Sequence, residues 1–545
     1  MNQWTTRIAG GLAALIGLIG LASTVAPTND RYFEMMKSIE IYTNVYKELN
    51  TYYVDEVEPS QLMRIGIEAM VSSLDPYTNF ISESDVERAR LRQSGQYQGI
   101  GADMRLLNDR PTIMELFRDQ PADQAGLKVG DRILEVDGQN TEGRNLEQLE
   151  EIMRGFPGTI MELVVERPGS GRVNISLTRG DLNIQNVPYY GMLDQNVGYV
   201  ALTTFTRQAA KNVRDAVQEL RADNPAMQGV VLDLRYNGGG LLNEAVDIVN
   251  IWAPRDELIV STRGKVREWD RSYKTNGNPL DLEMPVAVLV NGRSASASEI
   301  VSGALQDLDR AIIIGQQTYG KGLVQNIMET GYSSRVKITT AKYYIPSNRC
   351  IQALNYVDGE PVDIPDDQRA VFQTRAGRPV LDGGGVAPDV ELPVLGDNPV
   401  TKSLIDNNIL FDYVNQWVLD RPTIDTVTEF RFTDWDNFMG FLSEGDYAFT
   451  SETERLLEKA LEEASTEGYP VDTELAALQA TIDAQQTAAI NEYKTEIIKM
   501  IEKEIASRYY YQRGRVQMGL RNDAEVVEAI SILTDPARYN EILKP

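Results

Sequence analysis

The chain contains no histidine, and this absence excludes several kinds of catalytic site at once. A Ser-His-Asp triad, a Cys-His pair and a metal site built from imidazole groups all need a residue that is missing here. The 545 residues include a single cysteine, Cys350, so no internal disulfide can form. If a serine acts as a nucleophile in this chain, its base must therefore be a lysine or a carboxylate.

Positive charge is also in short supply. The chain has 53 Lys and Arg residues against 80 Asp and Glu residues, which gives a formal net charge of −27. Proteins that bind nucleic acids need basic patches for the phosphates, so we expect no nucleic-acid partner. An acidic balance suits a soluble exported protein. A chain of 545 residues is too long for one hydrophobic core, which predicts several domains.

One long uncharged apolar run, residues 8–26, lies at the start of the chain and directly after Arg7. A basic residue before a short apolar segment is typical of a secretory signal. The run is also just long enough to span a bilayer, and Thr24-Val-Ala26 is a poor cleavage site. Residues 1–28 are thus either a cleaved signal or a membrane anchor. Either reading predicts an exported, periplasmic protein, attached to the inner membrane if the run is kept.

A serine-rich turn is the first candidate for chemistry. The apolar run Val286–Val290 predicts a buried strand, residues 300–305 predict a helix, and the sequence between them ends in Ser-Ala-Ser-Ala-Ser-Glu. A strand, a tight turn and a helix start place a serine hydroxyl beside N–H groups that no helical carbonyl uses. Such a site can attack a carbonyl and hold the oxyanion. The alternative is a plain helix cap, since Ser296 and Glu299 fit the capping box.

The base candidate is Lys321, which lies between two glycines in the segment Thr-Tyr-Gly-Lys-Gly at 318–322. Burial lowers the pKa of a lysine, so that its neutral amine can accept a proton from serine. The alternative is an exposed turn lysine. The segment also matches most of a phosphate-binding loop, but Gly322 stands where Ser or Thr would hold Mg²⁺. Residues 323–344 moreover alternate like strands instead of forming the required helix.

Three segments together resemble the carboxy-terminal processing proteases, the tail-specific peptidases that use a Ser-Lys dyad. They are Ser294–Glu299, Ala304–Asp307 (Ala-Leu-Gln-Asp) and Thr318–Gln325 (Thr-Tyr-Gly-Lys-Gly-Leu-Val-Gln). The resemblance extends from about residue 42 to residue 390. It implies a nucleophile at Ser296, a general base at Lys321, a lysine-orienting amide at Gln325 and a structural acid at Asp307. It implies no metal and no cofactor.

A glycine-rich turn at 233–240 (Asp-Leu-Arg-Tyr-Asn-Gly-Gly-Gly) follows the apolar run 230–234. Consecutive glycines let the backbone approach a substrate closely or adopt positive φ. On its own this is equally a plain strand–helix turn. The resemblance implies that the N–H groups of Gly240 and Ala297 form the oxyanion hole, with Gly239 as a second choice beside Gly240.

Residues 97–180 change to a pattern of strands and turns. The segments 99–102, 120–127 (Gln-Pro-Ala-Asp-Gln-Ala-Gly-Leu) and 129–138 resemble a PDZ domain, although a small structural β-domain is the alternative. PDZ domains add a peptide strand to a sheet edge and hold its terminal carboxylate on loop N–H groups. The resemblance assigns that loop to Gly99, Ile100, Gly101 and Ala102. It also makes Arg154 a candidate relay to the protease site, with a surface arginine as the alternative.

The sequence thus predicts a multidomain α+β protein. Its expected parts are a signal or anchor (1–28), a helical region (29–96), a PDZ domain (97–180), an α/β protease core (181–396) and a helical region (397–545). In the last of these, amphipathic spacing predicts helices over 452–464 and 472–511, which form either a packing arm or a homodimer surface. The predicted function is an exported serine endopeptidase that binds protein or peptide substrates by their C-terminal tails. The alternative is a tail-binding scaffold with an inactive peptidase core.

Overall fold

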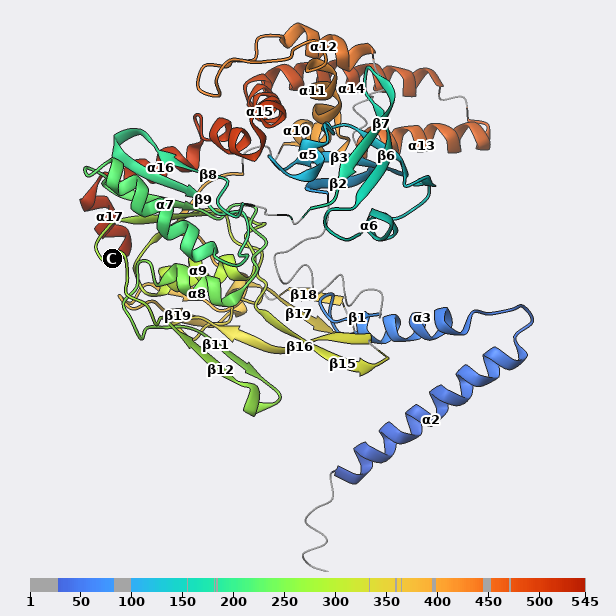
Figure 1. Ribbon diagram of the computed structural model, residues 1–545, viewed down its shortest axis with the longest axis horizontal. Helices are drawn as coiled ribbons and strands as arrows, with labels where there is room; N and C mark the ends of the chain where they lie inside the picture. The colour runs from blue at the N-terminus through green and yellow to red at the C-terminus, as the bar shows by residue number, and fades with distance from the viewer. Residues whose placement is uncertain are drawn as a thin grey trace, which may run out of the picture. The chain divides into compact units, whose positions relative to one another are not determined.

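The computed structural model describes residues 28–82, 100–153, 155–180, 182, 185–332, 334–357, 360–363, 365–394, 398–444, 452–469 and 472–544 (Figure 1). The apolar run 8–26, Gly99 and Arg154 lie outside these residues. Within them, no helix combines the length and the apolar character that a membrane span requires. The chain divides into two compact units, one of residues 1–80 with 358–360 and one of residues 81–357 with 361–545.

The described part of the first unit is mostly helical. It contains α2 (Thr28–Tyr52) and α3 (Pro59–Ser72), and β1 (Asn79–Ile81) follows them. Pro59 opens α3, where its missing N–H costs no hydrogen bond. The Tyr46 hydroxyl donates to the Pro59 carbonyl at 2.9 Å, which fixes the turn between the two helices.

The second unit begins with the β-domain that resembles a PDZ domain. Its elements are β2 (Ala102–Leu107), β3 (Arg110–Leu116), α5 (Pro121–Gln124), β4 (Arg132–Val136), β5 (Gln139–Asn140), α6 (Leu146–Met153), β6 (Ile160–Arg167) and β7 (Gly171–Thr178). The antiparallel order is β2-β3-β4-β6-β7. Alternate residues of β6 and β7 are buried, so one face of the sheet packs on a small apolar core. Among the described strands, β2 pairs only with β3 and forms one edge.

The α/β core is a mostly parallel sheet with helices on both faces. Its strand order is β21 (Val390–Glu391), β14 (Ile312–Gly315), β13 (Val286–Val290), β10 (Gly229–Asp233), β9 (Val197–Ala201) and antiparallel β8 (Tyr189–Met192). One face packs on α7 (Ala209–Asp223), α8 (Leu242–Val249) and α9 (Ala297–Asp307). The other packs on α16 (Ala524–Leu533) and α17 (Pro536–Leu543) (Figure 1). All residues of β9, β10 and β13 are buried, as expected for strands covered on both faces.

Because β10, β13 and β14 run parallel, the loops that follow them leave the sheet at one edge. The serine-rich turn follows β13, the glycine turn follows β10 and the lysine loop follows β14. Topology alone therefore places the three predicted catalytic segments at the same edge. In the sequence, these three segments lie tens of residues apart.

A second, antiparallel sheet extends the core. It contains β15 (Leu323–Gly331), β16 (Ser334–Tyr344), β11 (Leu258–Gly264) and β12 (Arg271–Lys274), with β15 and β16 forming a long hairpin directly after the lysine loop. The predicted strand alternation at 323–344 is confirmed. Smaller elements nearby are β17 (Leu354–Val357), β18 (Glu360–Asp363), β19 (Val371–Gln373), β20 (Pro379–Leu381) and 3₁₀ turns at Asp194–Asn196, Arg267–Trp269 and Asp366–Gln368.

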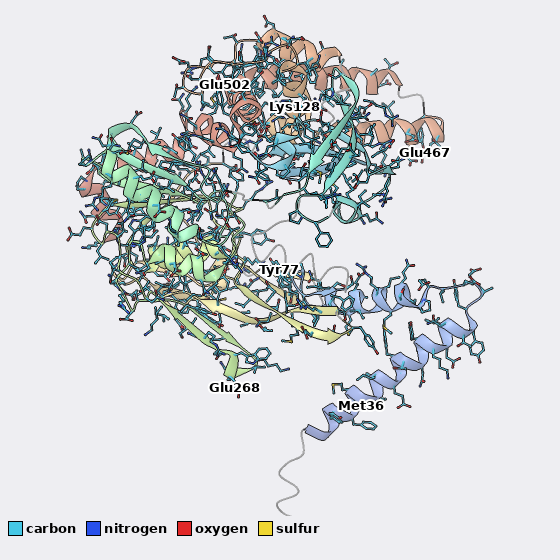
Figure 2. The ribbon with its side chains drawn as sticks, in the orientation of Figure 1. Met36, Tyr77, Lys128, Glu268, Glu467 and Glu502 are labelled. Carbon is cyan, nitrogen blue, oxygen red and sulfur yellow. The ribbon has the colours of Figure 1, made fainter. Side chains whose placement is uncertain are left out.

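The C-terminal region is helical: α10 (Pro399–Asp406), α11 (Ile409–Trp417), α12 (Trp435–Glu444), α13 (Glu452–Glu467), α14 (Asp472–Glu492) and α15 (Lys494–Gly519) precede α16 and α17. The expected single helix over 472–511 is wrong. One helix ends before Tyr493 and the next begins after it, and α15 is itself kinked at Tyr511, where φ is 55°. Glu502, labelled in Figure 2, accepts from the Phe432 N–H at 2.8 Å inside this region's apolar core. The overall class, multidomain α+β, is as predicted.

Candidate active site

The serine-rich turn holds one residue in an unusual backbone conformation. Ser296 directly precedes α9 and has φ 56° and ψ −110°, which a residue with a side chain rarely adopts. Such strain persists only where neighbouring contacts impose it, and it concentrates at functional sites. A serine raised on a strained strand-to-helix turn is also the geometry that hydrolases use to expose a nucleophile.

The glycine turn after β10 supplies those neighbouring contacts. Its Asn237 carbonyl accepts from the Ala295 N–H at 3.0 Å and from the Ser298 hydroxyl at 2.8 Å. The Ser294 hydroxyl donates to the Leu234 carbonyl at 2.9 Å. Gly239 packs so tightly here that a Cβ on it would lie 2.9 Å from the Ser296 Cβ. These hydrogen bonds therefore hold the two turns together around Ser296. The backbone of residue 239 comes so close to Ser296 that only glycine fits there.

The backbone N–H groups predicted for the oxyanion hole differ in whether they already have an acceptor. In the described part of the chain, the N–H groups of Gly240 and Ala297 donate to no acceptor. The Gly239 N–H, in contrast, donates to the Asn237 side-chain oxygen at 2.9 Å. Of the two glycines considered from the sequence, Gly240 is thus the one with a donor to offer. Its φ of 146° is open only to glycine.

A single carboxylate, that of Glu299, joins the serine turn to the lysine loop. One of its oxygens accepts from the Ser296 N–H at 2.7 Å and from the Lys321 N–H at 2.8 Å. The other accepts from the Gly320 N–H and the Thr318 hydroxyl, both at 2.6 Å. Because one oxygen serves both residues, the backbones of Ser296 and Lys321 lie side by side.

The electrostatics of the site suit a lysine base. Lys321 is half-buried, and desolvation lowers its pKa below the ordinary value of 10.5. The nearby charge of Lys337 lowers that pKa further, while Glu299 opposes the change. Burial raises the pKa of the fully buried Glu299 to about 6, against the opposing effect of its four hydrogen bonds. At neutral pH, Glu299 is therefore still a carboxylate.

The other residues predicted for the core make contacts of their own. The Gln325 amide, on β15, donates to the Thr339 hydroxyl on β16 at 3.3 Å. Asp307, at the end of α9, is buried and pairs with Arg349 at 3.0 Å, which ties α9 to the segment after β16. Burial raises the pKa of the Cys350 thiol, so that it stays protonated. Within the described residues, no group of carboxylates and cysteine is placed to hold a metal ion.

The predicted peptide-binding loop is described from Ile100 onward. Ile100 is buried, Gly101 has φ 79°, and Ala102 begins the edge strand β2. The Ile100 carbonyl accepts from the Ala122 N–H at 2.7 Å, and the Gly101 carbonyl accepts from the Phe117 N–H at 3.0 Å. These bonds fix the loop at the start of the sheet edge that an added peptide strand would extend.

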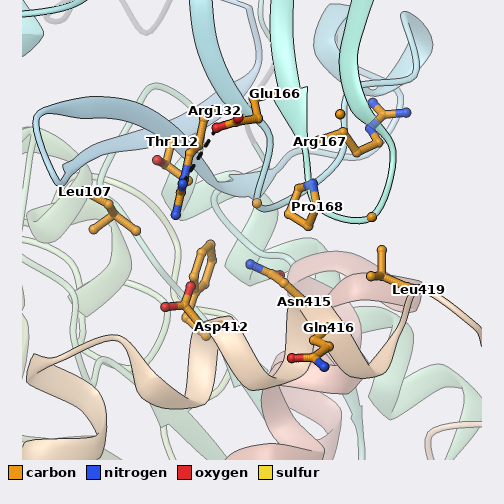
Figure 3. A pocket seen from close by; sticks show the side chains of 14 residues that line it. Leu107, Thr112, Arg132, Glu166, Arg167, Pro168, Asp412, Asn415, Gln416 and Leu419 are labelled. Atoms are coloured by element: carbon orange, nitrogen blue, oxygen red, sulfur yellow. Dashed lines mark ion pairs between the residues drawn. The ribbon is translucent and has the colours of Figure 1, made fainter. Parts of the chain in front are cut away.

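A separate cavity of about 650 Å³ lies between the β-domain and α11 (Figure 3). Arg132 and Glu166, an ion pair at 3.7 Å, line it from the strands, and Asp412, Asn415 and Gln416 line it from the helix. None of the predicted site residues that the structure describes lines this cavity. It belongs to the contact between the β-domain and the C-terminal helices.

The fold and the site define the class of this protein as a serine peptidase that carries a PDZ domain. Three family models match the chain: peptidase family S41 over residues 196–359, a PDZ domain over 114–167, and the C-terminal helical domain of a probable PDZ-protease over 400–533. The chain belongs to the carboxy-terminal processing proteases of this peptidase family, as its similarity to known proteins shows.

Over 358 residues the chain is 32% identical to the carboxy-terminal-processing protease of Bartonella bacilliformis, an alignment that covers 65% of this chain and 81% of that protein. It is 32% identical over 338 residues to a probable CtpA-like serine protease of Staphylococcus haemolyticus, covering 61% of this chain and 66% of the relative. Among solved structures, the photosystem II D1 C-terminal processing protease is 26% identical, with 65% of this chain and 92% of that chain covered and a TM-score of 0.37. The predicted family and enzyme class are confirmed.

Sequence reasoning identified Glu299 only as a capping partner of Ser296. The capping spacing was visible, and the carboxylate does accept from the Ser296 N–H. Its contacts with the lysine loop depend on how β13 and β14 lie in the sheet, which no local pattern reports. Asn237, the residue that joins the glycine turn to the serine turn, was missed for the same reason.

Replacing Glu299 by Gln tests the joint between the two turns. The Gln amide NH₂ must face either the Gly320 N–H or the N–H groups of Ser296 and Lys321, so in either orientation the joint loses at least one backbone hydrogen bond. We expect kcat to fall on the order of 10²-fold and the free energy of unfolding to fall by about 1–3 kcal/mol. Peptide cleavage kinetics and thermal unfolding measure the two effects.

The matched control is Glu502→Gln, which changes another buried carboxylate that accepts a backbone N–H, in the apolar core of the C-terminal helices. We expect this control to lose stability and to keep its kcat. A folded Glu299→Gln variant whose kcat stays within about twofold of the wild type would show that Glu299 does not position the site.

Proposed function

We propose that this carboxy-terminal processing protease is an exported endopeptidase that cuts peptide bonds with a Ser296–Lys321 dyad. The observation that carries the proposal is the shared carboxylate oxygen of Glu299, which accepts from the N–H groups of both residues. The strained backbone of Ser296 and the lowered pKa of Lys321 support the same assignment. The lack of histidine leaves lysine as the natural base.

Acylation starts when the neutral Lys321 amine takes the Ser296 hydroxyl proton while the oxygen attacks the peptide carbonyl carbon. The resulting oxyanion accepts hydrogen bonds from the Gly240 and Ala297 N–H groups. In other hydrolases, one donor of this kind contributes roughly 10²–10³ in rate. The peptide C–N bond then breaks, and the Lys321 ammonium returns the proton to the leaving amine.

Deacylation uses the same groups in the same roles. Lys321, neutral again, takes a proton from a water molecule that attacks the acyl-ester carbon. The oxyanion again accepts hydrogen bonds from the N–H groups of Gly240 and Ala297. The ester C–O bond then breaks, and Lys321 returns the proton to the Ser296 oxygen. Gln325 orients the lysine from β15, where its amide is held by Thr339. No metal or cofactor takes part in these steps.

We assign substrate capture to the PDZ domain. A substrate tail adds to the free edge of β2, and its terminal carboxylate binds the N–H groups of the loop 99–102. The described part of this loop lies directly before the edge strand, which supports the assignment. Met104 on β2, partly buried against the domain core, adds an apolar side chain to this strand, and we infer from it a preference for an apolar last residue.

Single substitutions of the dyad test the chemistry. Ser296→Ala removes the attacking oxygen and Lys321→Met removes the base, so each should lower peptide turnover by at least about 10³-fold. Turnover is followed by mass spectrometry, with folding checked by circular dichroism. A Ser296→Ala protein that cleaves at the wild-type rate would refute the dyad. A wild-type protein that binds tails without cutting them would favour the inactive-scaffold alternative.

The pH dependence of kcat/KM tests the state of the amine. Because the free enzyme needs neutral Lys321, activity rises with pH through the Lys321 pKa, which lies below the ordinary 10.5. Lys337 holds that pKa down, so Lys337→Gln should move the rising limb to higher pH and lower activity at neutral pH. Lys342→Gln, on the same strand, is the control and should leave the limb in place. An unchanged limb in Lys337→Gln contradicts the assignment of the limb to Lys321.

We also propose export, on the strength of the basic Arg7 and the apolar run 8–26 that follows it. Kept in the mature protein, this run attaches the enzyme to the inner membrane. Cell fractionation with N-terminal sequencing of the mature chain tests both points. Finding the protein in the cytoplasmic fraction with its first residues intact contradicts export.

A further inference from the structure

Two carboxylates from the end of the chain lie at the catalytic edge of the parallel sheet. Asp523 caps α16, accepting from the Glu525 and Val526 N–H groups at 3.0 and 3.2 Å. Glu525 lies in the first turn of the helix and is buried. Helix α16 covers one face of the sheet (Figure 1), so its first turn ends up beside the loops that follow β10 and β14.

The first of these loops meets the carboxylates through Arg235. This residue lies in the turn that leads to Gly240, and its side chain is only 16% exposed. The guanidinium donates to Asp233 at 2.6 Å, to Asp523 at 2.8 Å and to Glu525 at 2.5 Å. The planar guanidinium fixes the direction of each hydrogen bond as well as its length. These bonds therefore hold the start of the glycine turn in place after β10.

The second loop meets the other oxygen of Glu525. The Gln316 amide donates to this oxygen at 2.6 Å and to the Leu392 carbonyl at 3.0 Å. Gln316 directly follows β14, and its own N–H donates to the Val290 carbonyl at 3.1 Å. It opens the segment that carries Lys321. One carboxylate of the C-terminal helix thus holds both the turn that bears Gly240 and the loop that bears Lys321.

We propose that Glu525, supported by Asp523, is a positioning residue for peptide-bond cleavage, and that the C-terminal helix is a working part of the active site. This inference rests on the proposed Ser296–Lys321 chemistry. The Glu525 clasp, defined as Glu525 with Arg235 and Gln316, fixes the outer ends of both loops. Glu299 fixes their inner ends at Ser296 and Lys321.

Anchoring of the helix alone does not account for the clasp. The apolar side chains of Val526, Ala529, Ile532 and Leu533 already pack α16 against the sheet. A buried ion pair adds little stability over apolar residues of the same size, because desolvation offsets the attraction between the charges. What such a pair does impose is a fixed geometry, and here that geometry falls on the two loops that carry the chemistry.

The test compares Glu525→Gln with Glu528→Gln in the full-length protein. Glu528 lies on the same helix, but pairs with Arg538 away from the loops. The probe is an internally quenched peptide with an apolar C-terminal residue. We expect Glu525→Gln to lower kcat on the order of 10²-fold while KM stays within about twofold, since misplaced catalytic groups slow the chemical step. Glu528→Gln should match the wild type.

Gln316→Met provides a second variant that leaves every charge in place. It should also lower kcat, and the double variant should be no slower than the slower single variant, because both changes break one clasp. If Glu525→Gln does not fold, the kcat of Gln316→Met alone tests the inference. Rates are normalised to the folded fraction, so a merely structural role would lower the melting temperature and leave kcat unchanged.

The inference is overturned if the folded variants keep a kcat within about twofold of Glu528→Gln, or if the losses in the double variant multiply. Ser296→Ala separates this failure from a failure of the proposed function. When Ser296→Ala is inactive and Glu525→Gln is not impaired, only the clasp is wrong. When Ser296→Ala cleaves normally, the dyad itself is wrong and the clasp has no chemistry to position.

Discussion

The active site depends on one buried carboxylate. Glu299 is fully buried, and the cost of removing its charge from water is offset by four hydrogen bonds from the serine turn and the lysine loop. Without this carboxylate, these buried and half-buried donors would lose their acceptor. The same contacts explain how Ser296 can keep its strained backbone, because the surrounding bonds over-determine its position. The hydrogen bonds that stabilise the buried carboxylate thus also hold Ser296 in its strained backbone conformation.

The absence of histidine sets the other constraint. An imidazole is partly neutral at physiological pH without help, whereas a lysine needs its environment to become neutral. Here desolvation and the neighbouring Lys337 supply that environment. Both effects require the lysine loop to stay against the core. The contacts that bring the backbones of Lys321 and Ser296 together therefore also keep the Lys321 amine where its pKa is lowered, and loosening the loop would return that pKa toward its ordinary value.

Local patterns predicted much of this structure. The strand Val286–Val290 has the predicted bounds, and the helix after it begins at Ala297, three residues earlier than the apolar run suggested, because Ser296 caps it. The long helix expected over 472–511 was wrong, since amphipathic spacing continues across Tyr493 while the backbone does not. Contacts across the chain were out of reach: Glu299 meets Lys321 over 22 residues, and Arg235 meets Glu525 over 290. Such contacts follow from sheet order, which spacing along the chain does not encode.

The position of Glu525 near the end of the chain has a consequence for the protein's own synthesis. A ribosome completes both members of the dyad more than 200 residues before it reaches this glutamate. Under the proposed role of the Glu525 clasp, the emerging polypeptide therefore carries both members of the dyad before the residue that positions their loops. The order of translation then acts as a built-in delay.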